Sequence, residues 1–210
     1  MTETVPAATL AAALPQRRPI HPVIVRLTHW INAVAMAVMI SSGWAIHNAY
    51  PTLPWQFPVW TTLGGSLIGG LRWHFAAMWV VMVNGLVYLA YGLSSGRLRR
   101  KLLPITPRAV VADLRAALAG RLSHDDISVY NAVQRLLYLG VIVAGILVVA
   151  SGLSIWKPVQ LRWLTTLFGD FDNARLIHFA AMSAIVGFIV VHAAMALLVP
   201  KTLRAMIRGR

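Results

Sequence analysis

Hydrophobic residues gather in four stretches, at about 27–46, 74–93, 132–153 and 177–199, which contain none of the 11 prolines. Each stretch is long enough to cross a hydrocarbon core of about 30 Å as a helix. No alternation of apolar and polar residues competes with this pattern. Because a helix satisfies its own backbone hydrogen bonds in lipid, the pattern predicts an all-α transmembrane four-helix bundle.

The segments outside these stretches complete the predicted organisation. Residues 1–20 are rich in alanine and proline, so we predict a flexible N-terminal tail before a single domain that spans 21–205. Between the second and third stretches, residues 108–118 favour a short amphipathic helix on the membrane surface.

Composition agrees with a membrane protein. Hydrophobic residues make up 58% of the chain and charged residues 12%, and the mean hydropathy is +0.68. There is no cysteine, which excludes disulfides, thiolate-held iron–sulfur clusters, covalent c-type haem and cysteine-based zinc sites. Any metal centre must therefore use histidine, methionine or oxygen ligands.

The net charge of +13 is unevenly distributed along the chain. Fourteen of the 19 basic residues lie before the first stretch, between the second and third, or after the fourth. Basic loops stay on the cytoplasmic side, so we predict that both termini and the middle loop are cytoplasmic. The positive charge is then explained by this topology and by membrane lipid, and it does not indicate nucleic-acid binding.

Four histidines lie inside the apolar stretches. His178 and His192 are fourteen residues apart, which places both on one helix face and separates them by about 21 Å along the axis. With alternating helix directions, His74 reaches the outer depth of His178, and His29 reaches the inner depth of His192. A lone buried histidine is usually a satisfied core residue, but two pairs at matching depths favour ligand pairs, because ionisable groups in a membrane are costly without partners.

Two imidazoles on opposite sides of a planar macrocycle are the ligand set of b-type haem iron in its bis-histidine form. Zinc prefers tetrahedral geometry and usually takes three or four protein ligands. We therefore predict two haem b groups, with His29/His192 and His74/His178 as the metal ligands.

Further candidates surround these histidines, each with two possible roles. Arg26, Arg72 and Arg175 lie about one turn closer to water than a histidine, where they can pair with haem propionates or anchor the helix at the interface. Arg135 can bind an anionic group or extend to the headgroups. Tyr88, at the inner depth, can donate a hydrogen bond to a cofactor or act as an anchoring aromatic residue.

Four glycines and one more histidine complete the set. Gly43, fourteen residues after His29, allows either a flat cofactor or a neighbouring helix to approach the backbone, and the same holds for Gly140, Gly145 and Gly152 of the third stretch. We expect His47 to be a solvated loop residue and not a ligand.

Several motifs resemble those of the bacterial cytochrome b561 and Ni/Fe-hydrogenase cytochrome b family. They are Arg26-Leu27-Thr28-His29-Trp30, Trp73-His74-Phe75, Asn84-Gly85-Leu86-Val87-Tyr88, Tyr130-Asn131 with Gln134-Arg135, and Ala174-Arg175 with His178-Phe179 and His192. The resemblance covers about 20–205, with a particular likeness to thiosulfate-reductase-type cytochrome b subunits. It implies a four-helix di-haem protein of the bacterial inner membrane and agrees with the four histidine ligands.

The first functional hypothesis is an electron-transfer subunit of respiratory electron transport. It would connect a quinone (ubiquinone or menaquinone), bound near the inner haem, with a periplasmic oxidoreductase partner, for which the resemblance favours a molybdenum enzyme. The alternative is a stand-alone superoxide:ubiquinone oxidoreductase, similar to the superoxide oxidase of this family. That activity needs a positive outer surface, whereas the outer loops carry four basic and two acidic residues. A third hypothesis is a membrane anchor without a cofactor.

Overall fold

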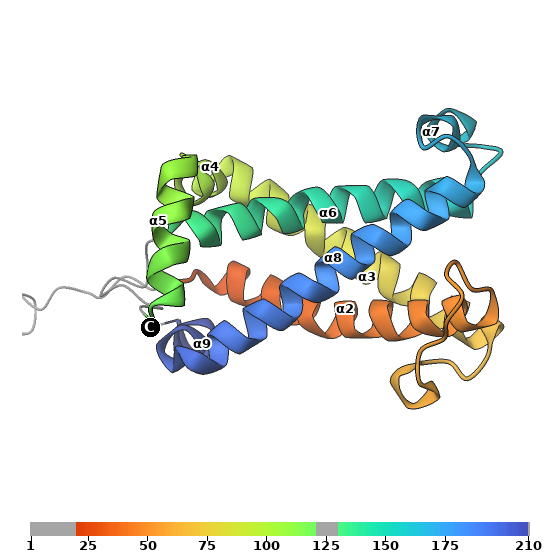
Figure 1. The fold of residues 1–210 in the computed structure, drawn as a ribbon, viewed down its shortest axis with the longest axis horizontal. Helices are drawn as coiled ribbons and strands as arrows, with labels where there is room; N and C mark the ends of the chain where they lie inside the picture. The colour runs from red at the N-terminus through yellow and green to blue at the C-terminus, as the bar shows by residue number, and fades with distance from the viewer. Residues whose placement is uncertain (1–19, 121–129, 210) are drawn as a thin grey trace, which may run out of the picture.

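The computed structural model describes residues 20–120 and 130–209, and four long helices form its body (Figure 1). These are α2 (Val23–Ala49), α3 (Leu67–Ser94), α6 (Ala132–Trp156) and α8 (Phe171–Leu198), each long and apolar enough to cross a membrane. The predictions of an all-α fold and of four membrane-spanning helices are confirmed. Residues 1–19 of the predicted tail lie outside the described residues.

The long helices extend beyond their apolar stretches because polar caps set where they begin. The α3 helix begins at Leu67 rather than near 74, after the Ser66 hydroxyl accepts a hydrogen bond from Gly69 N. The α8 helix begins at Phe171 rather than near 177, after the Asp170 carboxylate accepts one from Asn173 N. Hydropathy detects the part of a helix that lies in hydrocarbon, whereas a cap can lie a turn or two further out.

Short helices occupy the two ends of the bundle. At one end, which we call the terminal end, lie α4 (Arg97–Leu102), α5 (Pro107–Leu118), α9 (Pro200–Arg208) and the C-terminus (Figure 1). At the other, the loop end, lie the 50–66 connection with η1 (Val59–Thr61), and α7 (Arg162–Leu167). The α5 helix runs across the direction of α6 in Figure 1 and confirms the predicted short helix near 108–118.

The long helices pack as two pairs, α2 with α3 and α6 with α8. Within the first pair the buried Asn84 side chain joins the helices, because its Nδ2 donates to Thr28 O at 2.8 Å and to Asn32 Oδ1 at 2.7 Å. The backbones of the two pairs approach each other closely at few points. The space between the pairs is where the four intramembrane histidines meet.

At the terminal end, both ends of the described chain are joined. Ile20 N donates to Gly209 O at 2.9 Å. The Arg26 guanidinium donates to Met206 O and Ile207 O, and Arg97 donates to Ile20 O at 3.3 Å. Through these bonds α9 is held against the start of α2.

Candidate functional site

The structure brings the four intramembrane histidines together in the two predicted couples. The ring centroids of His29 and His192, the terminal pair, are 5.9 Å apart, and those of His74 and His178, the loop-end pair, are 6.4 Å apart. Two imidazoles that bind one metal through facing nitrogens, each at about 2 Å, hold their centroids about 6 Å apart. Both pairs therefore have the spacing of a bis-imidazole site.

Neither pair has the ligands for a bare metal ion. Among the described residues, no group of three or more His, Cys, Asp or Glu side chains could hold one. A pair of imidazoles needs a planar ligand set to complete its coordination, and a macrocycle supplies one. The donor set therefore fits haem and does not fit structural zinc.

The loop-end pair lines a partly open, apolar pocket between the two helix pairs. Flexible, apolar methionines supply much of its lining: Met36, Met39, Met78, Met82 and Met182. Cofactor sites are typically lined by apolar side chains with a few placed polar groups. The lining of this pocket, with an imidazole on each side, therefore suits a porphyrin.

Two glycines leave room for the imidazoles of this pair. A Cβ added at Gly43 would lie 3.5 Å from His74 Cε1, and one added at Gly152 would lie 3.1 Å from His178 Cε1. The second distance is shorter than a normal carbon–carbon contact. Gly152 therefore permits the observed position of His178.

Hydrogen bonds orient both rings of the loop-end pair. His74 Nδ1 lies 3.1 Å from Met39 O and 3.2 Å from Ser42 Oγ, and His178 Nδ1 lies 3.2 Å from Ser151 Oγ. A carbonyl oxygen only accepts, so the hydrogen-bond network assigns the hydrogen of His74 to Nδ1. Its Nε2 is then the nitrogen with the free lone pair, as a metal ligand requires.

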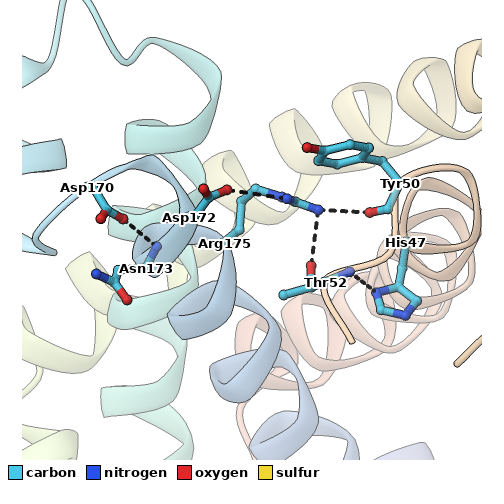
Figure 2. A network of polar contacts seen from close by, with 7 residues as sticks. All are labelled: His47, Tyr50, Thr52, Asp170, Asp172, Asn173 and Arg175. Atoms are coloured by element: carbon cyan, nitrogen blue, oxygen red, sulfur yellow. Dashed lines mark hydrogen bonds and ion pairs between the residues drawn. The ribbon is translucent and has the colours of Figure 1, made fainter. Parts of the chain in front are cut away.

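Arg175 joins α8 to the loop end. Its guanidinium donates to Tyr50 O at 2.8 Å and to Thr52 Oγ1 at 3.3 Å, and lies 3.6 Å from Asp172 Oδ1 (Figure 2). It also lies over the Tyr50 ring, 4.3 Å from the centroid. The structure thus gives Arg175 a clear part in holding the loop, and propionate binding stays a prediction.

The other predicted arginines have different surroundings. Arg26 binds carbonyls of α9, as described above, and Arg135 donates to Tyr130 O and Pro104 O, both at 3.0 Å. The Arg72 side chain is exposed at the loop end. Their predicted role toward an anionic group is not tested by these contacts.

The expectation of a solvated His47 was wrong, since only 6% of its surface is exposed. Its Nδ1 accepts from Thr52 N at 3.4 Å (Figure 2). Its Nε2 lies 3.0 Å from Trp55 O. Its ring contacts Trp55, Phe57 and Phe179. The 50–66 connection folds back over the end of α2, so a position that follows an apolar stretch becomes buried.

A buried polar atom lies in the same region. The indole Nε1 of Trp44 is buried and has no hydrogen-bond partner among the described residues, while its ring stacks on Phe57 at 4.5 Å. A buried N–H without an acceptor is rare in proteins.

Sequence reasoning missed a cluster of rings beside the terminal pair. Phe188 stacks on His192 at 5.5 Å, and Tyr138 lies 6.5 Å from His192 and 5.0 Å from Tyr130. The ammonium of Lys101 lies 5.3 Å from the Tyr130 ring centroid. Burial raises the pKa of the Tyr130 hydroxyl, so this phenol stays protonated at neutral pH.

Tyr88 and His21 extend this cluster. Tyr88 of α3 lies near Tyr130 and Tyr138. Burial, followed by the charges of Arg97 and Lys101, lowers the pKa of His21 to about 4, so its imidazole is neutral at pH 7. One signal in the sequence could have found Tyr138: it precedes Gly152 by fourteen residues, as His29 precedes Gly43.

Membrane-spanning helices that set imidazoles in facing pairs beside apolar space define the class of membrane b-type cytochromes. The chain belongs to the prokaryotic cytochrome b561 family, whose model matches residues 20–209. Membership implies b-type haem as the cofactor of this multi-pass membrane protein and a role in electron transport. The family predicted from the sequence motifs is confirmed.

Individual relatives agree with this assignment. The chain is 53% identical over 190 residues to a putative protein-methionine-sulfoxide reductase subunit YedZ1 of Azospira oryzae. This match covers 90% of this chain and 96% of that protein. It is 26% identical over 186 residues to a probable Ni/Fe-hydrogenase B-type cytochrome subunit of Cupriavidus necator, covering 80% and 74%. A protein of the same description from Azotobacter vinelandii is 24% identical over 184 residues, covering 80% and 75%.

Proposed function

We propose that this protein is a di-haem cytochrome b that transfers electrons between the quinone pool and a periplasmic oxidoreductase across the bacterial inner membrane. The observation that carries the proposal is the presence of two facing histidine pairs, with centroid distances of 5.9 and 6.4 Å. Their α8 members, His178 and His192, are separated by about 21 Å along the helix axis. Two redox groups at these depths would connect the two faces of a membrane.

In this proposal His29 and His192 ligate one haem, and His74 and His178 ligate the other. Bound haem supplies the one-electron iron couple, and the protein supplies ligands, burial and orientation. Met39, Ser42 and Ser151 hold the loop-end imidazoles, and the apolar side chains around them exclude water. Because two histidines would hold each haem, the sites would favour electron transfer over chemistry at the metal.

The direction of the bundle follows from its charges. The terminal end carries the basic residues of α4, α5 and α9, so the positive-inside rule places this end in the cytoplasm. The terminal pair is then the inner one, and the loop end with α7 faces the periplasm. One relative is named a protein-methionine-sulfoxide reductase subunit, which supports an oxidoreductase of that type as the periplasmic partner. The motif resemblance favours a molybdenum-dependent one.

The ring cluster at the terminal end is the best-supported quinone site. A quinone carbonyl needs hydrogen-bond donors close to a redox centre, and Tyr130 and Tyr138 lie beside His192. Within the described part of the chain no hydrogen bond engages the hydroxyls of Tyr88, Tyr130 and Tyr138. These hydroxyls can therefore serve a quinone head group.

The stand-alone superoxide oxidase has less support. A steering surface needs a net positive field. At the loop end, Arg72, Lys157, Arg162 and Arg175 are opposed by Asp170 and Asp172, and the Asp172 carboxylate lies 3.6 Å from Arg175. The net positive electrostatic field at the loop end is therefore small.

Haem stoichiometry tests the proposal. A dithionite-reduced minus oxidised spectrum, with haem quantified per purified chain, should give two b-type haems in the native protein and about one in His178→Ala and in His192→Ala, because each variant loses one ligand pair. His47→Ala is the matched control. His47 is a buried histidine at the loop end that packs against Trp55, Phe57 and Phe179, and this variant should keep two haems. A native chain with one haem, or a control that loses as much as the ligand variants, would contradict the assignment.

A further inference from the structure

Two Ser-Gly pairs occupy equivalent positions in the two halves of the bundle, Ser42-Gly43 in α2 and Ser151-Gly152 in α6. Both serines are completely buried. Ser42 Oγ–H donates to Val38 O and Ser151 Oγ–H donates to Leu147 O, each at 2.6 Å. Since the single hydroxyl hydrogen is committed to a carbonyl four residues earlier, each Oγ presents lone pairs to its other neighbour.

That neighbour is a histidine of the loop-end pair in both cases. Ser42 Oγ lies 3.2 Å from His74 Nδ1, and Ser151 Oγ lies 3.2 Å from His178 Nδ1. His74 has a second acceptor in Met39 O, three residues before Ser42, at 3.1 Å. Each Nδ1–H therefore donates to a buried serine oxygen, and the two serines belong to different helices.

The adjacent glycines complete the arrangement. Gly43 and Gly152 have no Cβ, and each faces the Cε1 atom of the histidine whose Nδ1 its serine contacts. Serine orients the ring and glycine makes space for it. The repetition of the whole unit on α2 and α6 indicates a common task.

The terminal pair lacks this arrangement. In the two described ranges, no hydrogen bond engages a ring nitrogen of His29 or His192. Their rings instead contact aromatic side chains, Trp30 beside His29 and Phe188 beside His192. The two histidine pairs are therefore chemically unequal.

We propose that Ser42 and Ser151 are positioning residues that tune the haem held by His74 and His178, so that the two haems differ in reduction potential. The inference rests on the proposed function, because it requires haem at the loop-end pair. An acceptor on Nδ1–H fixes the tautomer, sets the ring orientation and makes Nε2 a stronger electron donor. A stronger donor favours the oxidised metal, so the serines lower the potential of this haem.

Alanine substitution with matched controls tests the inference on the full-length protein. The variants are Ser42→Ala, Ser151→Ala and the double substitution. The controls are Ser41→Ala, whose hydroxyl donates to Ala37 O at 2.7 Å, and Ser154→Ala, whose buried hydroxyl donates to Thr165 Oγ1 at 3.0 Å. The measurements are haem per chain, a potentiometric titration that resolves both haems, and the low-temperature electron paramagnetic resonance spectrum of the oxidised protein.

We expect two haems in every variant and a positive shift of one potential in each alanine variant, larger in the double variant. The controls should match the native protein. Repeating the titration in a His192→Ala background leaves the loop-end haem alone, and the shift must persist there. Ser42→Thr and Ser151→Thr keep the hydroxyl and should retain the native potential.

The possible failures are distinguishable. If two haems remain and neither potential moves beyond the controls, or if only the haem of the terminal pair shifts, the inference is overturned while the proposed function stands. If the alanine variants lose haem, the threonine variants decide: retained haem at the native potential supports the role of the hydroxyl, and loss overturns it. A native protein without haem at the loop-end pair would instead refute the proposed function.

Discussion

Gly152 is the residue at which one added methyl group should disturb the site most. Its Cβ would lie 3.1 Å from His178 Cε1, so the imidazole or the helix must move, whereas a Cβ at Gly43 would make an ordinary 3.5 Å contact with His74. Overpacking of this kind costs about 1–3 kcal/mol. We expect Gly152→Ala to lower haem content and melting temperature more than Gly43→Ala, as measured by pyridine haemochrome assay and thermal unfolding.

Gly145 supplies the control for this comparison, because a Cβ added there meets no atom within 4 Å. Gly145→Ala lies on the same helix as Gly152 and should leave haem content unchanged. Equal losses in all three variants would show that helix glycines matter for a reason other than clearance at the imidazoles.

At the scale of single residues, the sequence predicted which histidines meet and did not predict what holds them. Helix periodicity and alternating helix direction determine depth, so the two couples followed from spacing alone. The partners of Arg175 and the burial of His47 depend on where the 50–66 connection folds. Hydropathy carries no information about such a fold, because that segment lies outside the hydrocarbon core.

Among the elements, the α2–α3 pair depends on one buried amide. Asn84 donates two hydrogen bonds across to α2, and such bonds between membrane helices contribute about 0.6 kcal/mol on average and up to about 1.7. We expect Asn84→Ala to destabilise the protein by about 1–2 kcal/mol, measured by unfolding in detergent. Val83→Ala is the control, since Val83 is 60% exposed on the same helix; equal destabilisation would show that the amide adds nothing.

A repeated spacing relates the two helix pairs. Fourteen residues separate His29 from Gly43 and Tyr138 from Gly152, and the same number separates His74 from Tyr88 and His178 from His192. At the loop end, each helix pair contributes one glycine and one histidine at these positions. At the terminal end the corresponding four positions hold two histidines and two tyrosines. This places the proposed loop-end ligands on α3 and α8 and the proposed terminal ligands on α2 and α8.

For the whole molecule, the charge distribution predicts orientation. A fluorescent protein fused after Arg210 should fluoresce, and alkaline phosphatase at the same site should be inactive, because the terminal end is expected in the cytoplasm. Phosphatase inserted in the 50–66 connection should be active. The opposite pattern at both sites would invert the bundle and would move the proposed quinone site to the periplasmic face.

The sequence by itself determined the number of membrane-spanning helices, the family and the depth of each histidine. These properties depend on local composition and on the helix repeat, which act along one chain segment at a time. Only the tertiary structure decided that serines of α2 and α6 bind the Nδ1 atoms of His74 and His178, that His47 is buried, and that tyrosines gather beside His192. Those contacts join residues from different helices, and their distances depend on how the helices pack.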